Sequence, residues 1–344
     1  LIPAAAPPHK ALPEGTPEGA HRLAMTERMA DALSMPKVAE VSRMELDREG
    51  KSYTADTLRA IRAQYPDAQL WLLMGTDMFL TLHLWHDPEV ITQLAGICAF
   101  GRTEQDGEEL FAPQREFLSQ KYQAQIVTIT LPGLVDVSST RLRELLARGE
   151  GQEYLLPQVY GYILMNRLYG THADLKRLEL PELRACSYSM IRAKRIAHVK
   201  GTEEEAVRLA RRWGADEEHA RRAAILHDCT KYLELDEQLQ LCAKYGIVLD
   251  ELEQQAVKLL HSKTGACVAR HVYGVSDDIY EAIFWHTTGK ADMTLLEKLL
   301  YIADYMEPTR DFPGVERLRA LAYEDLDAAV LLGCEMSIQE MAER

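Results

Sequence analysis

The hydrophobic pattern of the first half of the chain predicts strands that alternate with helices. Short apolar runs of five to seven residues, typical of strands buried on both faces of a sheet, occur at 69–75, 94–100 and 125–131. Helical spacing lies between them, as in 54–65 and in 139–148, which a Ser/Thr cap opens and Gly149 closes. This alternation indicates a parallel, doubly wound α/β sheet of the Rossmann type over residues 1–170.

Beyond about residue 170 the pattern predicts helices only. Apolar residues recur with helical spacing and without any credible strand in the segments 203–213, 216–227, 252–273, 277–286 and 294–305. A polar segment that carries a proline joins the two halves between Gly170 and Cys186. Because 344 residues exceed what a single core usually holds, we expect two domains, 1–170 and an all-α domain at 186–344.

Composition and charge exclude several classes of protein. The formal net charge is −14, so long-range electrostatics opposes non-specific nucleic-acid binding, and an anionic ligand needs local cations or a metal. No apolar run approaches the roughly 18 residues of a membrane span. The six cysteines include no C-x-x-C pair, which is typical of reduced thiols in a cytoplasmic protein without disulfides. The sequence leaves open whether the chain forms a homo-oligomer.

Metal-ligand side chains interrupt buried-looking helices in the second half. The pair His227-Asp228 follows the apolar stretch 223–226, and His286 and Asp304 follow similar runs. A charged group at such a place is normally paired or bound to a metal. The candidate ligands are His198, His227, Asp228, His261, His286 and Asp304. Imidazole with carboxylate suits Fe, Mn, Co or Zn, and six ligands are enough for two ions that clamp a phosphoryl displacement.

Each candidate also has an ordinary structural interpretation. A lone histidine such as His198 is more often a capping or surface residue than a ligand. His219 and His271 lack an apolar context and are interpreted as solvated. The repetition of polar groups inside apolar helices, rather than any one residue, therefore favours a shared metal site.

The order His198, then His227-Asp228, then Asp304 resembles the HD phosphohydrolase superfamily. The segments 226–231 (Leu-His-Asp-Cys-Thr-Lys) and 301–315 look more closely like the bacterial YqeK group, which are symmetrical diadenosine-tetraphosphate hydrolases with a di-iron centre. The resemblance covers about 186–344 and implies cleavage of the tetraphosphate to two ADP, with the six ligands named above. It implies catalytic roles for Asp228, Lys231 and Arg310, the two cations holding phosphates; without the family, solvated charges explain them equally well.

The first half also carries candidate binding groups. Thr54 lies where a helix opens, and Asp77 follows a buried strand at the sheet edge where doubly wound folds bind ligands. The segment 137–143 (Val-Ser-Ser-Thr-Arg-Leu-Arg) places hydroxyls, free amides and two arginines at a helix N-terminus, which favours an anion. A plain Ser/Thr cap is the simpler explanation of that segment.

In this order the segments resemble bacterial nicotinate-nucleotide adenylyltransferase over about 1–169. The resemblance implies that the helix start at 138–143 handles the phosphates of ATP, bound with Mg. It implies that Thr54, Asp77 and Trp85 form the nicotinate-nucleotide pocket, with Trp85 stacking on the pyridine ring. The expected binding residues are Lys10, Thr54, Asp77, Trp85, Arg102, Ser138, Ser139, Thr140 and Arg143.

One departure from this family concerns catalysis. The family begins with a strand, a glycine-rich loop and an H-x-G-H motif, and no H-x-G-H occurs in this sequence, which starts at Leu1 rather than Met. We therefore expect an N-terminally truncated sheet and a transferase activity that is lost in this chain, although the full-length protein would have both activities.

Two alternatives for the second half remain open. One is an HD hydrolase of another nucleotide, such as a deoxynucleotide, an alarmone or a cyclic dinucleotide. The other is a metal-free regulatory module attached to the biosynthetic enzyme. The partners expected in every case are small nucleotides, without nucleic acid or membrane.

Overall fold

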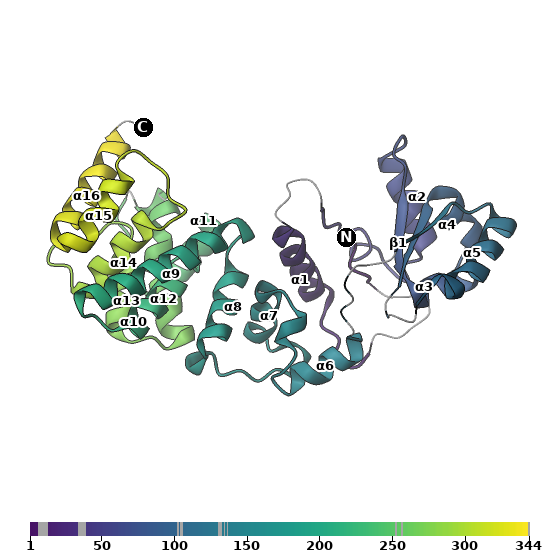
Figure 1. The fold of residues 1–344 in the computed structure, drawn as a ribbon, viewed down its shortest axis with the longest axis horizontal. Helices are drawn as coiled ribbons and strands as arrows, with labels where there is room; N and C mark the ends of the chain where they lie inside the picture. The colour runs from purple at the N-terminus through teal and green to yellow at the C-terminus, as the bar shows by residue number, and fades with distance from the viewer. Residues whose placement is uncertain are drawn as a thin grey trace. The chain divides into compact units, whose positions relative to one another are not determined.

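The computed structural model describes the whole chain except residues 6–12, 34–38, 102, 104–105, 130–132, 134, 136, 252, 256 and 343–344. Its internal contacts divide the chain into two compact units. The sheet unit consists of Leu1–Glu27 and Ala39–Tyr154, and the helical unit consists of Arg28–Val38 and Leu155–Arg344 (Figure 1).

The sheet unit contains three parallel strands. They are β1 (Trp71–Gly75), β2 (Gly96–Phe100) and β3 (Ile126–Ile129), hydrogen-bonded in the order β1-β2-β3. The helices of this part of the chain are α1 (Gly19–Ala32), α2 (Thr54–Gln64), α3 (Thr76–Thr81), η1 (Leu82–Leu84), α4 (Pro88–Leu94), α5 (Glu108–Tyr122), α6 (Ser139–Ala147) and η2 (Gln152–Tyr154). The parallel pairing and the helices between the strands confirm the predicted α/β class.

The core of this unit lies on one face of the sheet. Met74 of β1 and Ile97 of β2 pack with Phe79 of α3, Ile91 of α4 and Phe111 of α5, and all five are buried. The prediction that every strand is buried on both faces is wrong for the two outer strands among the described residues. Leu73 of β1 is 67% exposed and Val127 of β3 is 45% exposed. Within the described part of the sheet, β2 is the strand that has neighbours on both sides, and its residues are buried apart from the last.

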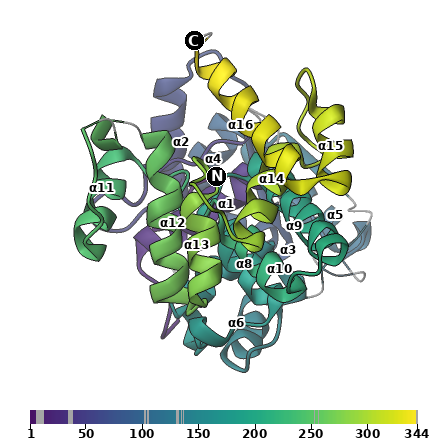
Figure 2. The same cartoon turned by 90° about the vertical axis from the view of Figure 1, so that its left-hand side faces the viewer.

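The helical unit contains no strand among its described residues, as the sequence predicts. Its elements are α7 (Pro157–Met165), η3 (Leu168–Gly170), η4 (Leu175–Arg177), α8 (Leu180–Met190), α9 (Ala193–Trp213), α10 (Glu217–Leu226), α11 (Leu235–Tyr245), η5 (Glu253–Gln255), α12 (Val257–Tyr273), α13 (Asp277–Trp285), α14 (Leu295–Met306), α15 (Val315–Glu324) and α16 (Leu326–Ala342). Figure 2 shows α9, α10, α12, α13 and α14 gathered into one bundle, in agreement with their mutual contacts.

Helix α7 belongs to the helical unit because it packs directly on α8. Gly161 lies so close to α8 that an added Cβ would be 1.9 Å from the carbonyl oxygen of Ala185. The thiol of Cys186 donates to the Gly161 carbonyl oxygen over 3.9 Å. This approach brings the stretch after Leu155 into the helical unit, whereas the functional domains expected from the sequence, 1–170 and 186–344, stay a prediction.

The end of α1 also belongs to the helical unit, although it comes early in the sequence. The Arg28 guanidinium lies 4.2 Å from the ring centroid of Tyr162, and its Nε donates to the Ser189 carbonyl oxygen over 2.9 Å. Asp31 accepts a hydrogen bond of 2.5 Å from the backbone N–H of Ala193, the first residue of α9. Asp31 therefore acts as a distant cap for a helix that has no side-chain cap of its own.

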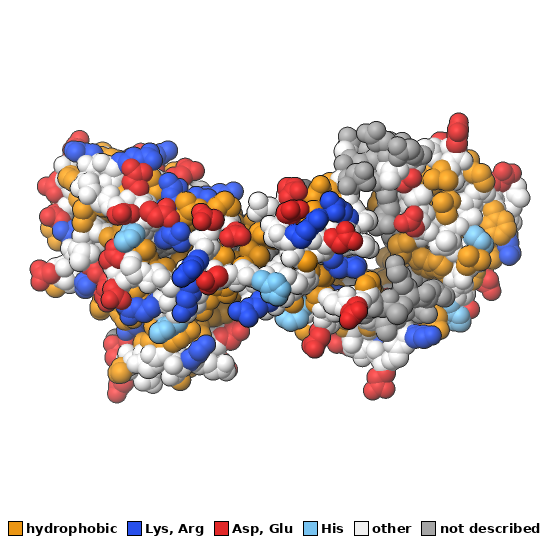
Figure 3. Space-filling model, turned by 90° about the horizontal axis from the view of Figure 1, so that it is seen from below, with side chains coloured by type: hydrophobic (Ala, Val, Ile, Leu, Met, Phe, Trp, Pro, Cys, Tyr) orange, Lys and Arg blue, Asp and Glu red, His pale blue; other side chains and the backbone are white. Residues whose placement is uncertain are grey.

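Two surface properties bear on partners. No helix in the described part of the chain combines the length and the hydropathy that crossing a membrane requires. On the face drawn in Figure 3, acidic and basic side chains are interspersed over the helical unit at the left of the view, without a broad area of either sign.

Candidate metal centre

Five helices bring the six predicted ligands together in the interior of the helical unit. His198 lies in the second turn of α9, His261 in the second turn of α12, and Asp304 in the last turn of α14. His227 and His286 are the residues that end α10 and α13, and Asp228 follows His227. All are buried except Asp304, whose side chain is 13% exposed.

The local sequence explains why the pair His227-Asp228 reaches the interior. The last turn of α10, from Ala223 to Leu226, is completely buried. The helix ends inside the bundle, and the next two residues are delivered to its centre. The apolar run before this charged pair is therefore the part of α10 that is buried in the bundle, as the sequence predicts.

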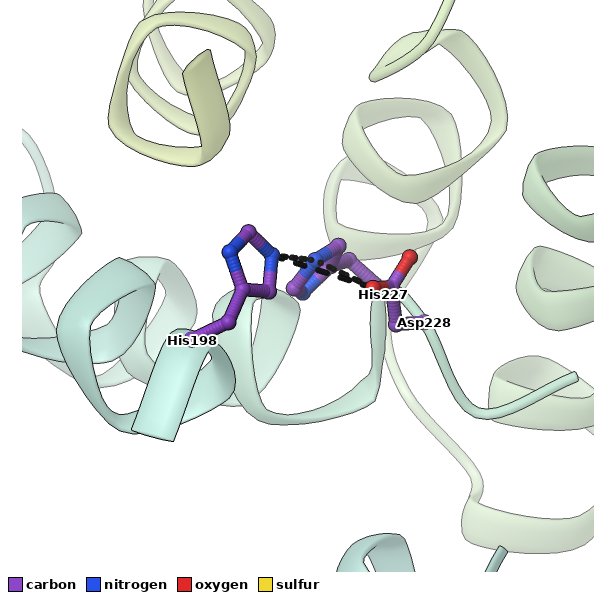
Figure 4. Close-up of side chains that lie close together, drawn as sticks. All are labelled: His198, His227 and Asp228. Carbon is purple, nitrogen blue, oxygen red and sulfur yellow. Dashed lines mark hydrogen bonds and ion pairs between the residues drawn. The ribbon is translucent and has the colours of Figure 1, made fainter. Parts of the chain in front are cut away.

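Asp228 lies at the middle of the cluster, with its two oxygens facing different histidines. Oδ2 is 3.4 Å from Nε2 of His227 and 3.7 Å from Nε2 of His198. Figure 4 shows these two rings, from α9 and the end of α10, pointing toward the carboxylate. Oδ1 is 3.2 Å from Nε2 of His261 and 3.8 Å from Nε2 of His286. One carboxylate therefore spans two pairs of imidazoles.

Asp304 closes the other side of the cluster. Its Oδ1 is 2.9 Å from Nε2 of His198 and 3.8 Å from Nε2 of His227. Three overlapping triads have one ligand atom per residue, all within 4.8 Å of one another: His198, His227 and Asp228; His227, His286 and Asp304; Asp228, His261 and His286.

Hydrogen bonds orient three of the imidazoles so that Nε2 faces the centre. Nδ1 of His227 is 2.7 Å from the carbonyl oxygen of Ala224, and Nδ1 of His286 is 2.7 Å from that of Ile283. Because a carbonyl oxygen only accepts, each Nδ1 carries the proton and each Nε2 presents a lone pair. Nδ1 of His198 is 2.9 Å from Oε1 of Glu307, which orients that ring in the same way.

The residues present fit a divalent metal. Nε2 of His286 is buried and has no hydrogen-bond partner among the described residues, although it faces a carboxylate oxygen. A buried lone pair without a partner is costly, and a metal ion relieves that cost. Neutral imidazoles with carboxylates form the donor set preferred by borderline first-row ions. The His/Asp cluster is therefore consistent with divalent metal binding.

Electrostatics keeps both carboxylates ionised. Burial alone would raise the pKa of Asp228, but the imidazoles of His227 and His261 around its carboxylate hold that pKa well below its usual range. Burial likewise opposes ionisation of Asp304, yet the neighbouring imidazoles of His198 and His227 hold its pKa well below normal. Two anionic groups in the interior are ready to bind a cation without first losing a proton.

The metal-free protein should lose stability in weak acid through His261. Burial lowers the pKa of His261 from 6.5 to about 4, against the opposing influence of Asp228. The unfolded chain protonates this imidazole below about pH 6.5, whereas the folded chain keeps it neutral, so acid favours unfolding. We expect His261 to remove about 2 kcal/mol from the free energy of unfolding between pH 7 and pH 5.

Urea unfolding of metal-stripped protein at both pH values, followed by circular dichroism, measures this loss. The variant His261→Gln, which cannot titrate there, should show about 2 kcal/mol less pH dependence than the wild type. An equal pH dependence in the two proteins would show that His261 is not held neutral by burial.

The two predicted phosphate-binding cations, Lys231 and Arg310, form ion pairs with the carboxylates of the cluster. Nζ of Lys231 is 3.1 Å from Oδ1 of Asp228, and Nη2 of Arg310 donates to Oδ1 of Asp304 over 2.9 Å. Both side chains are about one third exposed, so their charged ends lie between the buried cluster and solvent. Their catalytic roles stay a prediction, as do the ligand roles of the six residues.

Sequence reasoning missed two residues that contact the cluster. Nε of Arg195 donates to Oδ2 of Asp228 over 2.7 Å, and Glu307 receives Nδ1 of His198. The available signal was helical spacing, because Arg195 lies one turn before His198 and Glu307 lies one turn after Asp304.

The predicted binding residues of the sheet unit are only partly placed. Lys10 and Arg102 lie outside the described residues. Thr54 begins α2, and Asp77 is exposed in the first turn of α3 after β1. Trp85 is half-buried and packs against the apolar core of the sheet unit. Their binding roles stay a prediction.

The helix start at 138–143 has the geometry of an N-cap. The Ser138 hydroxyl accepts a hydrogen bond of 3.1 Å from the backbone N–H of Arg141 at the beginning of α6. Ser139 and Thr140 are exposed, and Arg143 is half-buried. The helix start is therefore explained as a serine cap, and phosphate binding by these residues stays a prediction.

Comparison with known proteins assigns both parts of the chain. The HD domain family matches residues 195–309, the segment that contains the whole cluster. The symmetrical bis(5'-nucleosyl)-tetraphosphatase of Bacillus subtilis is 40% identical over 151 residues, which are 44% of this chain and 81% of that protein. A solved structure from Clostridium acetobutylicum, described as a predicted HD superfamily hydrolase involved in NAD metabolism, is 36% identical, with a TM-score of 0.47, over 48% of this chain and 88% of that one.

A second set of relatives matches the N-terminal part. The protein of Lachnoclostridium phytofermentans named "Probable nicotinate-nucleotide adenylyltransferase" is 36% identical over 170 residues, covering 49% of this chain and 82% of that protein. Both resemblances expected from the motifs are therefore confirmed. The chain belongs to two families at once: through its C-terminal part to the HD-domain family of the symmetrical bis(5'-nucleosyl)-tetraphosphatases, and through its N-terminal part to the nicotinate-nucleotide adenylyltransferases.

Proposed function

We propose that the helical unit hydrolyses diadenosine tetraphosphate symmetrically, to two molecules of ADP. The observation that carries the proposal is the position of Asp228, whose two oxygens face two pairs of imidazoles as a carboxylate shared by two ions would. The relatives named for this activity, 40% identical in Bacillus subtilis and 41% in Halalkalibacterium halodurans, support the choice of substrate.

The proposed ligands are the six clustered residues His198, His227, Asp228, His261, His286 and Asp304. Two divalent ions held there would polarise a phosphoryl oxygen and lower the pKa of the attacking water. Iron is the proposed native metal, with Mn, Co or Zn as other ions that the donor set accepts. The bond that breaks is the central P–O–P bridge: water adds to one phosphorus, and the bridging oxygen leaves with the other ADP.

Lys231 and Arg310 hold the phosphates in this proposal. In the structure both cations form ion pairs with cluster carboxylates, Lys231 with Asp228 and Arg310 with Asp304. Their partial exposure lets them turn toward an incoming tetraphosphate, whose charge is otherwise repelled by a chain with a net charge of −14. The planar guanidinium of Arg310 suits bidentate binding of phosphate oxygens.

For the N-terminal part, about 1–170, we propose binding of nicotinate mononucleotide and Mg-ATP, with adenylyl transfer as the activity of the whole protein. The proposed nucleotide residues are Lys10, Thr54, Asp77, Trp85, Arg102, Ser138, Ser139, Thr140 and Arg143. Identity to adenylyltransferases over 82% of a relative's length supports this second function. It concerns the sheet unit and is independent of the metal centre.

Product analysis tests the hydrolase proposal directly. Full-length chain, stripped of metal and reloaded with Fe²⁺ or Mn²⁺, is incubated with diadenosine tetraphosphate, and the nucleotides are separated chromatographically. We expect ADP as the sole product and no turnover in the stripped protein. Release of ATP with AMP would contradict symmetrical cleavage, and turnover of an alarmone or cyclic dinucleotide alone would favour another HD activity.

A further inference from the structure

Glu307 lies behind His198, on the side of the ring away from the metal cluster. Its Oε1 is 2.9 Å from Nδ1 of His198, whose Nε2 is 2.9 Å from Asp304. The Glu307 side chain is completely buried. We propose that Glu307 is the positioning residue of the metal centre, fixing the orientation and the tautomer of His198.

The carboxylate itself is held in place by the turn that follows α14. The backbone N–H of Thr309 donates to Oε2 of Glu307 over 2.6 Å, and the Thr309 hydroxyl donates to Oε1. Arg319 of α15 fixes the same turn, because its guanidinium donates to the carbonyl oxygens of Met306, Glu307 and Arg310 over 2.8–2.9 Å. A side chain held by this many contacts has one orientation, as a positioning residue requires.

Helix α9 makes room for this carboxylate at a cost to its own stability. Gly201 lies one turn after His198, and a Cβ added there would be 2.5 Å from Oε2 of Glu307. Glycine inside a helix is about 1 kcal/mol less favourable than alanine. The packing of Glu307 explains why α9 contains a glycine at a place where its helical geometry does not need one.

The chemical effect follows from the hydrogen bond. A carboxylate accepts the Nδ1 proton of His198, so the lone pair is confined to Nε2, the atom that faces Asp304, His227 and Asp228. The same bond makes the imidazole a stronger donor to a metal. This inference rests on the proposed metal-dependent function and adds the residue that prepares one of its ligands.

Metal affinity tests the inference without reference to turnover. Calorimetric titration of metal-stripped, full-length Glu307→Ala with Co²⁺ should give an affinity about 10- to 100-fold weaker than that of the wild type. The visible absorption spectrum of the Co²⁺-loaded protein should also change, because His198 is no longer held in one orientation. Glu307→Gln, whose amide oxygen can still accept from Nδ1, should recover part of both properties.

Glu297→Ala is the matched control. Glu297 lies on α14, is equally buried and pairs with Lys290 instead of a cluster histidine. We expect this variant to keep the wild-type Co²⁺ affinity and spectrum even if it lowers the melting temperature. Gly201→Ala keeps the carboxylate but crowds it, so it should weaken Co²⁺ binding in the same direction as Glu307→Ala.

Two different failures can be told apart. Wild-type affinity and spectrum in Glu307→Ala would overturn the positioning role and leave the metal-dependent function intact. Equal losses in Glu297→Ala and Glu307→Ala would also overturn it, because general damage to the helix would then explain both. Absence of Co²⁺ binding by the wild type would instead refute the proposed function on which the inference rests.

Discussion

Asp228→Asn is expected to lower the rate of diadenosine-tetraphosphate hydrolysis by more than about 100-fold. This loss exceeds the loss of about 10- to 100-fold that is usual when a hydrogen-bond partner of a metal ligand is removed. Asparagine has nearly the same shape but lacks the charge that four imidazoles, Lys231 and Arg195 face in the structure. Its amide group also puts hydrogen-bond donors where one carboxylate oxygen accepts. Both pairs of imidazoles lose the anion that they share. The amount of metal bound per chain should therefore decrease together with the hydrolysis rate. Steady-state release of ADP and elemental analysis measure the two effects.

The control for this experiment is a second Asp–His pair on the surface of the same unit. Oδ2 of Asp278 lies 2.6 Å from Nδ1 of His219, and both side chains are exposed. Asp278→Asn should leave turnover and metal content unchanged. If Asp228→Asn retained more than a tenth of wild-type turnover with its full metal content, Asp228 would not be a ligand and the proposed centre would be wrong.

Gly161→Ala is expected to have the largest effect on stability. The added methyl group would lie 1.9 Å from the Ala185 carbonyl oxygen and 2.6 Å from the Cys186 nitrogen, both backbone atoms of α8 that cannot rotate away. The helices α7 and α8 must separate along their closely packed contact. We expect a loss of more than about 3 kcal/mol in the free energy of unfolding, above the usual range for overpacking.

Thermal unfolding followed by circular dichroism measures this loss. Gly333→Ala is the matched control, because Gly333 is also inside a helix but its nearest neighbour is a ring carbon of Tyr301 at 3.3 Å. A small shift of that side chain accommodates the methyl group, and alanine favours the helix by up to about 1 kcal/mol. Equal stability of Gly161→Ala and the wild type would mean that the two helices do not approach as closely as described.

The hydrophobic pattern reveals the buried pair His227-Asp228, whereas it does not reveal the exposure of the outer strands. His227 and Asp228 were predictable because an apolar run directly before a charged pair is visible in the sequence itself. The exposure of Leu73 was not, because apolar content does not say whether a strand lies at the centre or the edge of a small sheet. The same runs located the three strands and their parallel class, although the predicted runs begin one or two residues before β1, β2 and β3.

Helical spacing places Glu307 one turn after Asp304, but the histidine that it contacts depends on tertiary packing. Glu307 stands in a Glu-Pro-Thr-Arg segment that has the composition of an ordinary turn, and only the fold brings it to His198, 109 residues away. Gly161 gives no local signal either, since its importance depends on where α8 lies.

The contact between Asp31 and the first N–H of α9 has a consequence for how this protein is dissected. A recombinant fragment that begins near Leu155 would contain every metal-cluster residue but not Arg28 or Asp31, which belong to the same compact unit. The start of the helix that carries His198 would then be left without its acceptor. A helical unit excised at Leu155 is for this reason a different folding unit from the one in the intact chain.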